Sequence, residues 1–269
     1  MIVLFRSYGN HSNRLFQNIH LEAFCLEHGI DYANPTLSDL CPYYVDPARP
    51  DHQGMARILR SKPVAALRRA GLLSHVITFD HESDNAALLL SRHKGKALYV
   101  DGWGFRVFPL TEKYQDRLVA KYALKEDYLR ENDALRAMGK IDRDQYVVVA
   151  VHIRRSDYRY WRNGAYYFSD EVYRSYMTSM ESVVGKQLNK NVVFVIFSDE
   201  RTSFAEAANL VLSENPWYVD HYLMGQCDYI IGPPSTFTLW ASYAGRTRYL
   251  HITDASGHID VSQFDYCRG

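Results

Sequence analysis

Three features are scarce in this sequence of 269 residues: clustered cysteines, an excess of charge of one sign, and long apolar runs. The four cysteines lie far apart and form no Cys-x-x-Cys pair, which argues against a structural zinc site and a disulfide framework. Lysine plus arginine and aspartate plus glutamate number 31 each, so no overall field attracts nucleic acid or an anionic membrane. Any anion site must therefore be local.

The hydrophobic segments are also too short for membrane insertion or export. No segment is long and apolar enough to cross a bilayer, and the apolar start at residues 1–5 is too short for a signal sequence. We therefore expect a cytoplasmic protein with reduced thiols, no nucleic-acid partner and at most peripheral contact with the inner face of a membrane. Tyrosine and tryptophan, at 21 and 4 residues, are abundant enough to offer rings to sugar faces as well as to the core.

Length and periodicity predict two α/β lobes, residues 1–140 and 141–269, because the hydrophobic pattern lapses near 139–144. In the second lobe, strands alternating with helices predict a parallel sheet with helices on both faces. The expected strands there are 146–153, 192–197, 229–231 and 248–252, and the expected helices are 170–184, near 202–208, 218–227 and 236–243.

The first lobe is less regular. A strand at 2–5 precedes a polar loop and a helix that Asn13 caps and that ends at Gly29. Further strands are expected at 30–33 and 97–100, helices at 111–124 and 127–138, and loops with short helices between 35 and 96.

The most informative stretch is His152-Ile153-Arg154-Arg155-Ser156-Asp157-Tyr158, which begins where the apolar run 146–151 ends. Adjacent arginines at the carboxyl end of a buried strand place fixed positive charge where open α/β sheets bind ligands, and a guanidinium fork suits phosphate. One arginine could instead brace the loop by pairing with Asp157. Because neighbouring side chains point to opposite sides of an extended backbone, we expect that role for Arg155 rather than Arg154.

Two further motifs follow expected strands. Ser198-Asp199 ends the second strand of the lobe, where an ionised Asp199 would accept from N1–H and the exocyclic amine of guanine, although a helix N-cap is an equal alternative. In Gly232-Pro233-Pro234-Ser235-Thr236-Phe237 the prolines stop a strand and the hydroxyls open a helix. Amides at such a helix start attract phosphate, and capping alone would also explain Ser235. Together the three motifs predict a site for a sugar nucleotide diphosphate.

The stretch His152 to Tyr158 resembles the His-x-Arg-Arg-x-Asp motif of inverting fucosyltransferases that make α1,2 and α1,6 linkages. Phe197-Ser198-Asp199, Tyr222-Leu223-Met224-x-x-Cys227 and Ser235-Thr236-Phe237-x-x-Trp240-Ala241 are similar to later motifs of glycosyltransferase family 11. Ser12-Asn13-Arg14-Leu15-Phe16-Gln17 also resembles that family's Gly-Asn-Gln-Met-Phe-Gln, with Ser12 and Arg14 as departures. The resemblance covers both ends of the chain and lies within the wider α1,2, α1,6 and protein O-fucosyltransferase superfamily.

This resemblance implies a GT-B fold, two Rossmann-like lobes with a cleft between them, and GDP-fucose bound mainly by the second lobe without a metal. Arg154 would contact the β-phosphate and stabilise the leaving group. Asp157 would hold the motif loop, and Asn13 and Arg14 would belong to the N-terminal loop of the site. The expected donor-binding residues are His152, Arg154, Arg155, Ser198, Asp199, Ser235, Thr236 and Phe237.

Inverting transfer also needs a base for the acceptor hydroxyl, and the candidates in order are Asp157, His11 and Asp170. Asp142-Arg143-Asp144 spells a metal motif of other glycosyltransferases, but it precedes a strand and is interpreted as a turn. The leading hypothesis is α1,2-fucosyl transfer to a glycan or lipid-linked oligosaccharide in surface glycan synthesis. The alternatives are transfer from another GDP-sugar such as GDP-mannose, and a non-catalytic protein that binds GDP or glycans.

Overall fold

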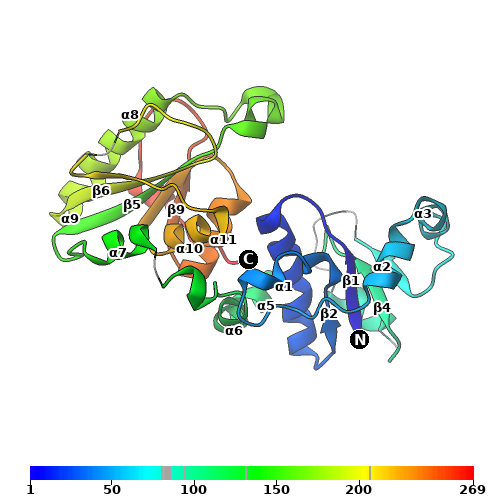
Figure 1. The fold of residues 1–269 in the computed structure, drawn as a ribbon. Coiled ribbons are helices and arrows are strands. Elements are labelled where there is room, and N and C mark those ends of the chain that lie inside the picture. Colours follow the sequence, from blue (N-terminus) through cyan, green and yellow to red (C-terminus); the bar gives the residue numbers. More distant parts are fainter. Residues whose placement is uncertain (80, 82–85, 94, 131, 206) are drawn as a thin grey trace. The chain divides into compact units, whose positions relative to one another are not determined.

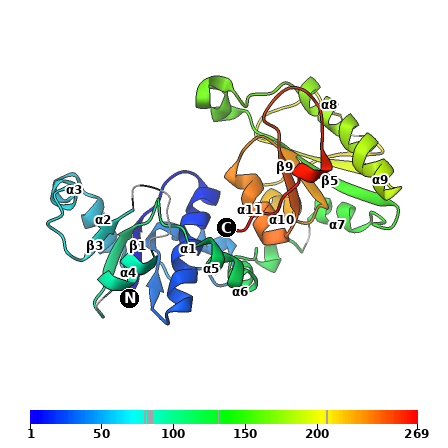
Figure 2. The ribbon, with the colours of Figure 1, turned by 180° about the vertical axis from the view of Figure 1, so that it is seen from behind.

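The computed structural model describes residues 1–79, 81, 86–93, 95–130, 132–205 and 207–269. It divides into two compact units: unit 1 is Met1–Lys125 with Arg268–Gly269, and unit 2 is Glu126–Cys267. Figures 1 and 2 show the elements of each unit from opposite sides. Each unit is an α/β fold built on a parallel sheet, as the sequence predicts.

The division between the units falls after Lys125, earlier than the expected boundary at 140/141. Helix α7 (Asp133–Gly139) belongs to unit 2. The residue before it anchors it there, because Asn132 Nδ2 donates to Asn215 Oδ1 at 2.7 Å. At the other end of the chain, the Arg268 carbonyl accepts from Thr111 Oγ1 of unit 1 at 2.8 Å. The lapse in periodicity at 139–144 therefore marks the loop before the first strand of unit 2.

In the described part of unit 1, the sheet has the strand order β2-β1-β4-β3. Alternation along β1 separates two apolar layers: Ile2 and Leu4 pack in one cluster with side chains of α1 and α4, and Val3 and Phe5 pack in another with side chains of α2. Helices thus cover both faces of this sheet (Figure 1). The strands are β1 (Ile2–Arg6), β2 (Tyr32–Ala33), β3 (Val76–Thr78) and β4 (Leu98–Asp101). The α-helices are α1 (His11–Glu27), α2 (Gln53–Arg60), α3 (Lys62–Arg69), α4 (Ala86–Arg92), α5 (Phe108–Lys113) and α6 (Gln115–Lys121), and two 3-10 turns are η1 (Pro35–Leu37) and η2 (Cys41–Tyr43).

In the described part of unit 2, a five-stranded sheet has the order β7-β6-β5-β8-β9. The odd-numbered side chains of β5, from Val147 to Ile153, pack with side chains of α8 in the main core, whereas His152 points to α11 on the other face. The strands are β5 (Tyr146–Ile153), β6 (Asn191–Ser198), β7 (Leu210–Leu212), β8 (Tyr229–Gly232) and β9 (Arg248–His251). The helices are α7, α8 (Asp170–Met180), α9 (Lys186–Leu188), α10 (Trp217–Gly225) and α11 (Thr236–Gly245), with a π-helical turn at Glu181–Gly185 and 3-10 turns η3 (Glu126–Tyr128), η4 (Ser156–Arg159), η5 (Trp161–Gly164) and η7 (Val261–Gln263).

Several expected elements differ from the structure. The described residues of 202–208 form no helix, and the chain instead leads into the edge strand β7, which pairs with β6. Helix α1 begins at His11 with Asn10 as its N-cap, so the prediction that Asn13 caps it is wrong. The helix expected at 111–124 is split at Tyr114 into α5 and α6. The helix expected at 127–138 is split into η3 and α7, and its Glu131 lies outside the described residues.

Candidate functional site

The candidate site lies at the carboxyl ends of β5 and β8, where the strand order of unit 2 changes direction. From β5 the chain proceeds to β6 and β7 on one side, then returns to β8 and β9 on the other. Such a switch point is where open α/β sheets bind ligands. The strands approach closely there, since a Cβ on Gly232 would lie 2.7 Å from the carbonyl oxygen of His152. The sequence motifs at 152–158 and 232–237 therefore meet at this point.

Arg154 lies just beyond β5, and its guanidinium is held between two carboxylates. Its Nη2 donates to Asp157 Oδ1 at 2.6 Å, and its Nη1 lies 2.8 Å from Asp199 Oδ2. The Arg154 side chain is 24% exposed, that of Asp199 is 19% exposed and that of Asp157 is 61% exposed. Arg154 is thus fixed in place at the sheet edge, and the more solvated of its partners is Asp157.

Arg155 points away from Arg154 and forms a buried ion pair. Its Nη2 donates to Asp170 Oδ1 at 2.5 Å, and Asp170 Oδ2 accepts the Ser203 amide at 2.6 Å. Burial opposes ionisation of Asp170, but the bonds from Ser203 and Arg155 outweigh it and lower its pKa. The expectation that Arg155 pairs with Asp157 is wrong, because Asp157 pairs with Arg154 three residues before it, while Arg155 pairs with Asp170, the first residue of α8.

Asp199 supports the loop after β5. Its Oδ1 accepts the Arg155 amide at 2.8 Å while its Oδ2 pairs with Arg154, so both oxygens have partners within unit 2. No described helix begins at Arg201, so an N-cap role for Asp199 is excluded. Its neighbour Ser198 closes the local turn, with Oγ donating to the Glu200 carbonyl at 2.7 Å.

His152 is buried inside the site. Its Nδ1 lies 2.9 Å from Thr238 Oγ1 of α11. Burial, reinforced by the positive charge of Arg154, lowers the pKa of His152 to about 3, so its imidazole is neutral at working pH. The Phe237 ring packs between two imidazoles, at 5.2 Å from that of His152 and 4.3 Å from that of His221. These side chains pack together and link β5 to α10 and α11.

The loop after β8 opens α11 as the sequence predicts. Ser235 is the N-cap residue, and its Oγ accepts from the Phe237 amide at 3.2 Å. Thr236 is the half-buried first residue of α11. Tyr158, absent from the expected site residues, links the two loops because its hydroxyl donates to the Pro234 carbonyl. The Arg154 Cζ lies 5.8 Å from the Tyr158 ring centroid, so this tyrosine also contacts the central guanidinium.

The expected N-terminal residues lie in unit 1, at the start of α1. His11 is the first helical residue, and Asn13 lies against Gly9, whose φ of +70° bends the preceding loop. Arg14 pairs with Asp39 at 2.5 Å and also donates to the Thr36 carbonyl. Arg14 therefore connects α1 to the segment around η1.

Unit 1 has its own polar cluster at the carboxyl ends of β1 and β4. The Tyr8 hydroxyl donates to Asp101 Oδ2 at 3.0 Å, and Arg6 lies 3.7 Å from the same oxygen. Burial and the Asp101 charge raise the pKa of Tyr8 to about 12. The Trp103 ring lies 5.5 Å from that of Tyr8 and is 37% exposed. This cluster is not among the sites expected from the sequence, although Asp101-Gly102-Trp103 directly follows an expected strand.

The structure also bears on metal binding and on membrane insertion. Within the described ranges, no group of three or more His, Cys, Asp or Glu side chains is arranged to hold a metal ion. Asp142 accepts the Asp144 amide at 2.9 Å, which makes 142–144 the turn that the sequence predicts. Of the helices the structure describes, none has the length and apolarity to span a bilayer.

No family model and no curated protein matches the sequence. Solved structures do match. An Arabidopsis thaliana FUT1 mutant in complex with GDP aligns with a TM-score of 0.61 at 10% identity, covering 98% of this chain and 73% of that one. NodZ α-1,6-fucosyltransferase soaked with GDP-fucose aligns with a TM-score of 0.53 at 14% identity, covering 98% and 97%. Selenomethionine fucosyltransferase NodZ from Bradyrhizobium aligns with a TM-score of 0.55 at 13% identity, covering 98% of this chain and 96% of that one. These matches show that this chain shares its fold with those structures over nearly its whole length.

Proposed function

We propose that this chain is an inverting glycosyltransferase that moves fucose from GDP-fucose to a glycan hydroxyl, forming an α1,2 linkage in surface glycan synthesis in the cytoplasm. The observation that supports it most is the position of Arg154, fixed at the switch point of a sheet whose fold matches fucosyltransferases, some bound to GDP or GDP-fucose. The proposal requires the donor on unit 2, the acceptor on unit 1, and the GT-B arrangement in which the two face one cleft.

Arg154 is assigned to the β-phosphate. The Arg154–Arg155 pair faces three carboxylates, those of Asp157, Asp170 and Asp199. A phosphate therefore competes with a carboxylate for the Arg154 guanidinium. Asp157 is the carboxylate that we expect to be displaced, because its side chain is the most exposed, whereas Asp199 also accepts a backbone amide. We assign Asp199 to positioning Arg154 rather than to reading guanine.

In the reaction, the bond between fucose C1 and the β-phosphate oxygen breaks as the acceptor oxygen bonds to C1 from the opposite face. The electron pair of the broken bond stays on GDP, where the Arg154 guanidinium stabilises the growing negative charge without a metal. The acceptor proton passes to a base. Asp157 contacts the guanidinium on the leaving-group side, and Asp170 has both oxygens engaged. We therefore place proton acceptance on unit 1, where His11 is the candidate.

The acceptor is assigned to the cluster of Tyr8, Asp101 and Trp103. An exposed indole beside a tyrosine offers an apolar face to a pyranose ring, and a tyrosine hydroxyl can hydrogen bond to sugar hydroxyls. Trp103 provides the exposed ring, and the buried Asp101 orients the Tyr8 hydroxyl beside it. A glycan or a lipid-linked oligosaccharide has the chemistry to fit.

A second candidate is a protein that binds GDP or glycans without turnover. The observation that favours it is the lack of a base at the unit 2 site, where Asp157 bonds to the Arg154 guanidinium and Asp170 has both oxygens engaged. This candidate predicts that GDP binds but that no sugar is transferred to any acceptor.

The proposed function is tested with a donor screen followed by mass spectrometry of glycan acceptors. GDP-fucose should stabilise the protein against thermal unfolding and yield a product 146 Da heavier, roughly the mass of an added fucosyl unit, as expected for group transfer. Arg154→Ala should lower turnover by about 10²- to 10³-fold, the typical cost of losing a stabilising donor, with an unchanged melting curve. Arg136→Ala is the control, because Arg136 also forms an exposed ion pair at i,i+3.

Three outcomes would contradict the assignment. Full turnover by Arg154→Ala would refute the role of that guanidinium. Preferential stabilisation by UDP-sugars would refute a GDP donor. Faster transfer from GDP-mannose than from GDP-fucose would replace the sugar and keep the site.

A further inference from the structure

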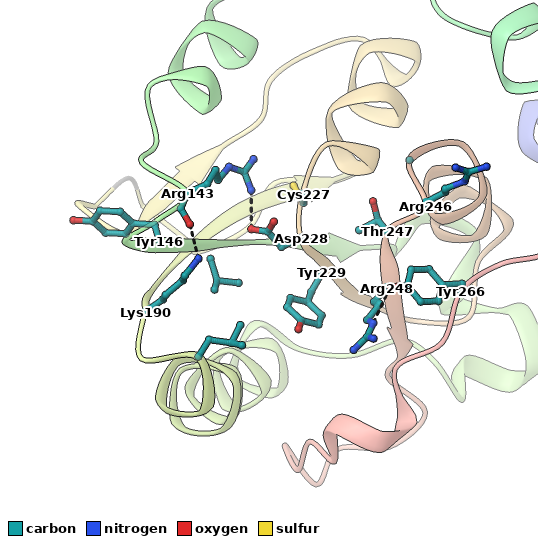
Figure 3. Close-up of a pocket in the computed structure, with 13 residues that line it drawn as sticks. Arg143, Tyr146, Lys190, Cys227, Asp228, Tyr229, Arg246, Thr247, Arg248 and Tyr266 are labelled. Carbon is teal, nitrogen blue, oxygen red and sulfur yellow. Dashed lines mark hydrogen bonds and ion pairs between the residues drawn. The ribbon is translucent and has the colours of Figure 1, made fainter. Parts of the chain in front are cut away.

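A cavity lies at the opposite edge of the unit 2 sheet from Arg154. It has a volume of about 350 Å³ and is lined by residues at or just before the amino ends of β5, β6, β8 and β9 (Figure 3). Arg143 and Tyr146 come from the start of β5, Lys190 precedes β6, and Arg248 begins β9. β5 is eight residues long, about 26 Å at ~3.3 Å per residue, so ligands at its two ends would not overlap.

Positive charge dominates the lining although the whole chain is neutral. Four cationic side chains and one carboxylate line the cavity: Arg143, Lys190, Arg246, Arg248 and Asp228. The carboxylate is paired with Arg143, whose Nη1 donates to Asp228 Oδ2 at 2.7 Å. The nearby Asp142 is outside the lining, and its oxygens accept from Asp144 and Gln145 in its own turn.

Lys190 and Arg248 are held in place by neutral oxygens. Lys190 Nζ donates to the Arg143 carbonyl at 2.6 Å, and Arg248 Nε donates to the Tyr266 hydroxyl at 2.9 Å. In Figure 3 these two cations lie on either side of Tyr229. Neither contact brings a carboxylate to the cation, so both positions keep their charge and still have donors to offer.

We propose that this cavity binds a phosphate-bearing ligand. Two or more fixed cations with guanidinium forks recognise phosphate oxygens, and a neutral overall charge means that the attraction is local to this cavity. Leu188 and the rings of Tyr146, Tyr229 and Tyr266 line it as well and give an apolar wall for the organic part of the ligand. The phosphate is carried either by a free molecule or by a lipid headgroup. The site is independent of the proposed transfer reaction.

Inorganic pyrophosphate is the first probe, titrated by calorimetry at constant ionic strength. The double variant Lys190→Gln with Arg248→Gln should bind it at least tenfold more weakly than the wild type. The control pair Lys186→Gln with Arg136→Gln removes exposed cations outside the lining and should bind it normally. Arg154→Ala removes the central cation of the donor site and should leave this binding intact. Melting curves of all variants establish that they are folded.

Flotation with phosphatidylcholine vesicles, with and without phosphatidylglycerol, is the second probe. Binding to the anionic vesicles that is lost in the Lys190 and Arg248 double variant assigns the phosphate to a lipid headgroup, and pyrophosphate binding alone assigns it to a free molecule. The proposal is overturned if the wild type binds neither probe, if the double variant binds both as the wild type does, or if Arg154→Ala alone abolishes binding.

Discussion

Replacing Asp157 by asparagine should tighten GDP binding. In the proposed donor site, Asp157 and a diphosphate compete for the Arg154 guanidinium, so removing the carboxylate charge removes both the competitor and its repulsion of phosphate. The Arg154–Asp157 pair is short at 2.6 Å, but the Asp157 side chain is 61% exposed and solvent screens it. Exposed ion pairs contribute about 0.2–1 kcal/mol, so the affinity for GDP should rise about 1.4- to fivefold.

Isothermal titration with GDP measures this effect directly. The matched control is Asp133→Asn, because Asp133 forms an exposed i,i+3 pair with Arg136, and it should leave GDP affinity unchanged. The gain should shrink at about 1 M salt, where the screening length falls to ~3 Å. Weaker GDP binding by Asp157→Asn would refute the reasoning and show that Asp157 orients Arg154 for the phosphate. Absence of GDP binding by the wild type would refute the proposed donor itself.

Three further predictions concern stability and the acceptor. Burial raises the pKa of Asp220 from 3.8 to about 6, so the folded state binds this proton more tightly than the unfolded state does. Stability on the order of 3 kcal/mol, present below about pH 4, is therefore lost as the pH rises through 6. Asp220→Asn should raise the Tm more at pH 8 than at pH 5, and an equal gain at both pH values would contradict this. In Gly232→Ala the new Cβ would lie 2.7 Å from the His152 carbonyl oxygen. This clash should lower the free energy of unfolding, measured by denaturant titration, by about 1–3 kcal/mol. Gly139→Ala is the control and should leave the free energy of unfolding unchanged, because no atom lies within 4 Å of its Cβ. Trp103→Ala should raise the KM for the glycan acceptor about tenfold, as loss of a stacked ring does, without changing GDP affinity; a matching loss of GDP affinity would place Trp103 elsewhere.

The central strands of unit 2 were predictable because burial on both faces leaves an unbroken apolar signal. β5 has the expected bounds, and β6 extends one residue beyond its expected range at each end. β7 was not predictable, because three residues at a sheet edge carry too little pattern and depend on pairing with β6. The helix expected near 202–208 does not form in the described residues, because the pairing of the following strand β7 with β6 outweighs local helix propensity.

The sequence predicts that the motifs of the candidate site meet at one edge of the sheet, but it does not predict the contacts between their side chains. A strand ending in Arg154 and Arg155 indicates an anion site, and topology alone brings Ser235 beside it. The partners of the two arginines come from residues up to 45 positions away, such as Asp199, and no local pattern encodes which carboxylate each guanidinium meets. The same rule of strand ends, applied to β4, would have found Asp101 from the sequence.

The hydrogen bond from Tyr158 to the Pro234 carbonyl limits how this protein can be re-engineered. This bond couples the loop after β5 to the loop after β8, so exchanging either loop alone for one from a structural neighbour would break the contact. A chimera that replaces 154–160 needs a phenol at 158, or it must replace the Pro233-Pro234 turn as well. Libraries aimed at new donors should therefore vary both loops together and keep this tyrosine.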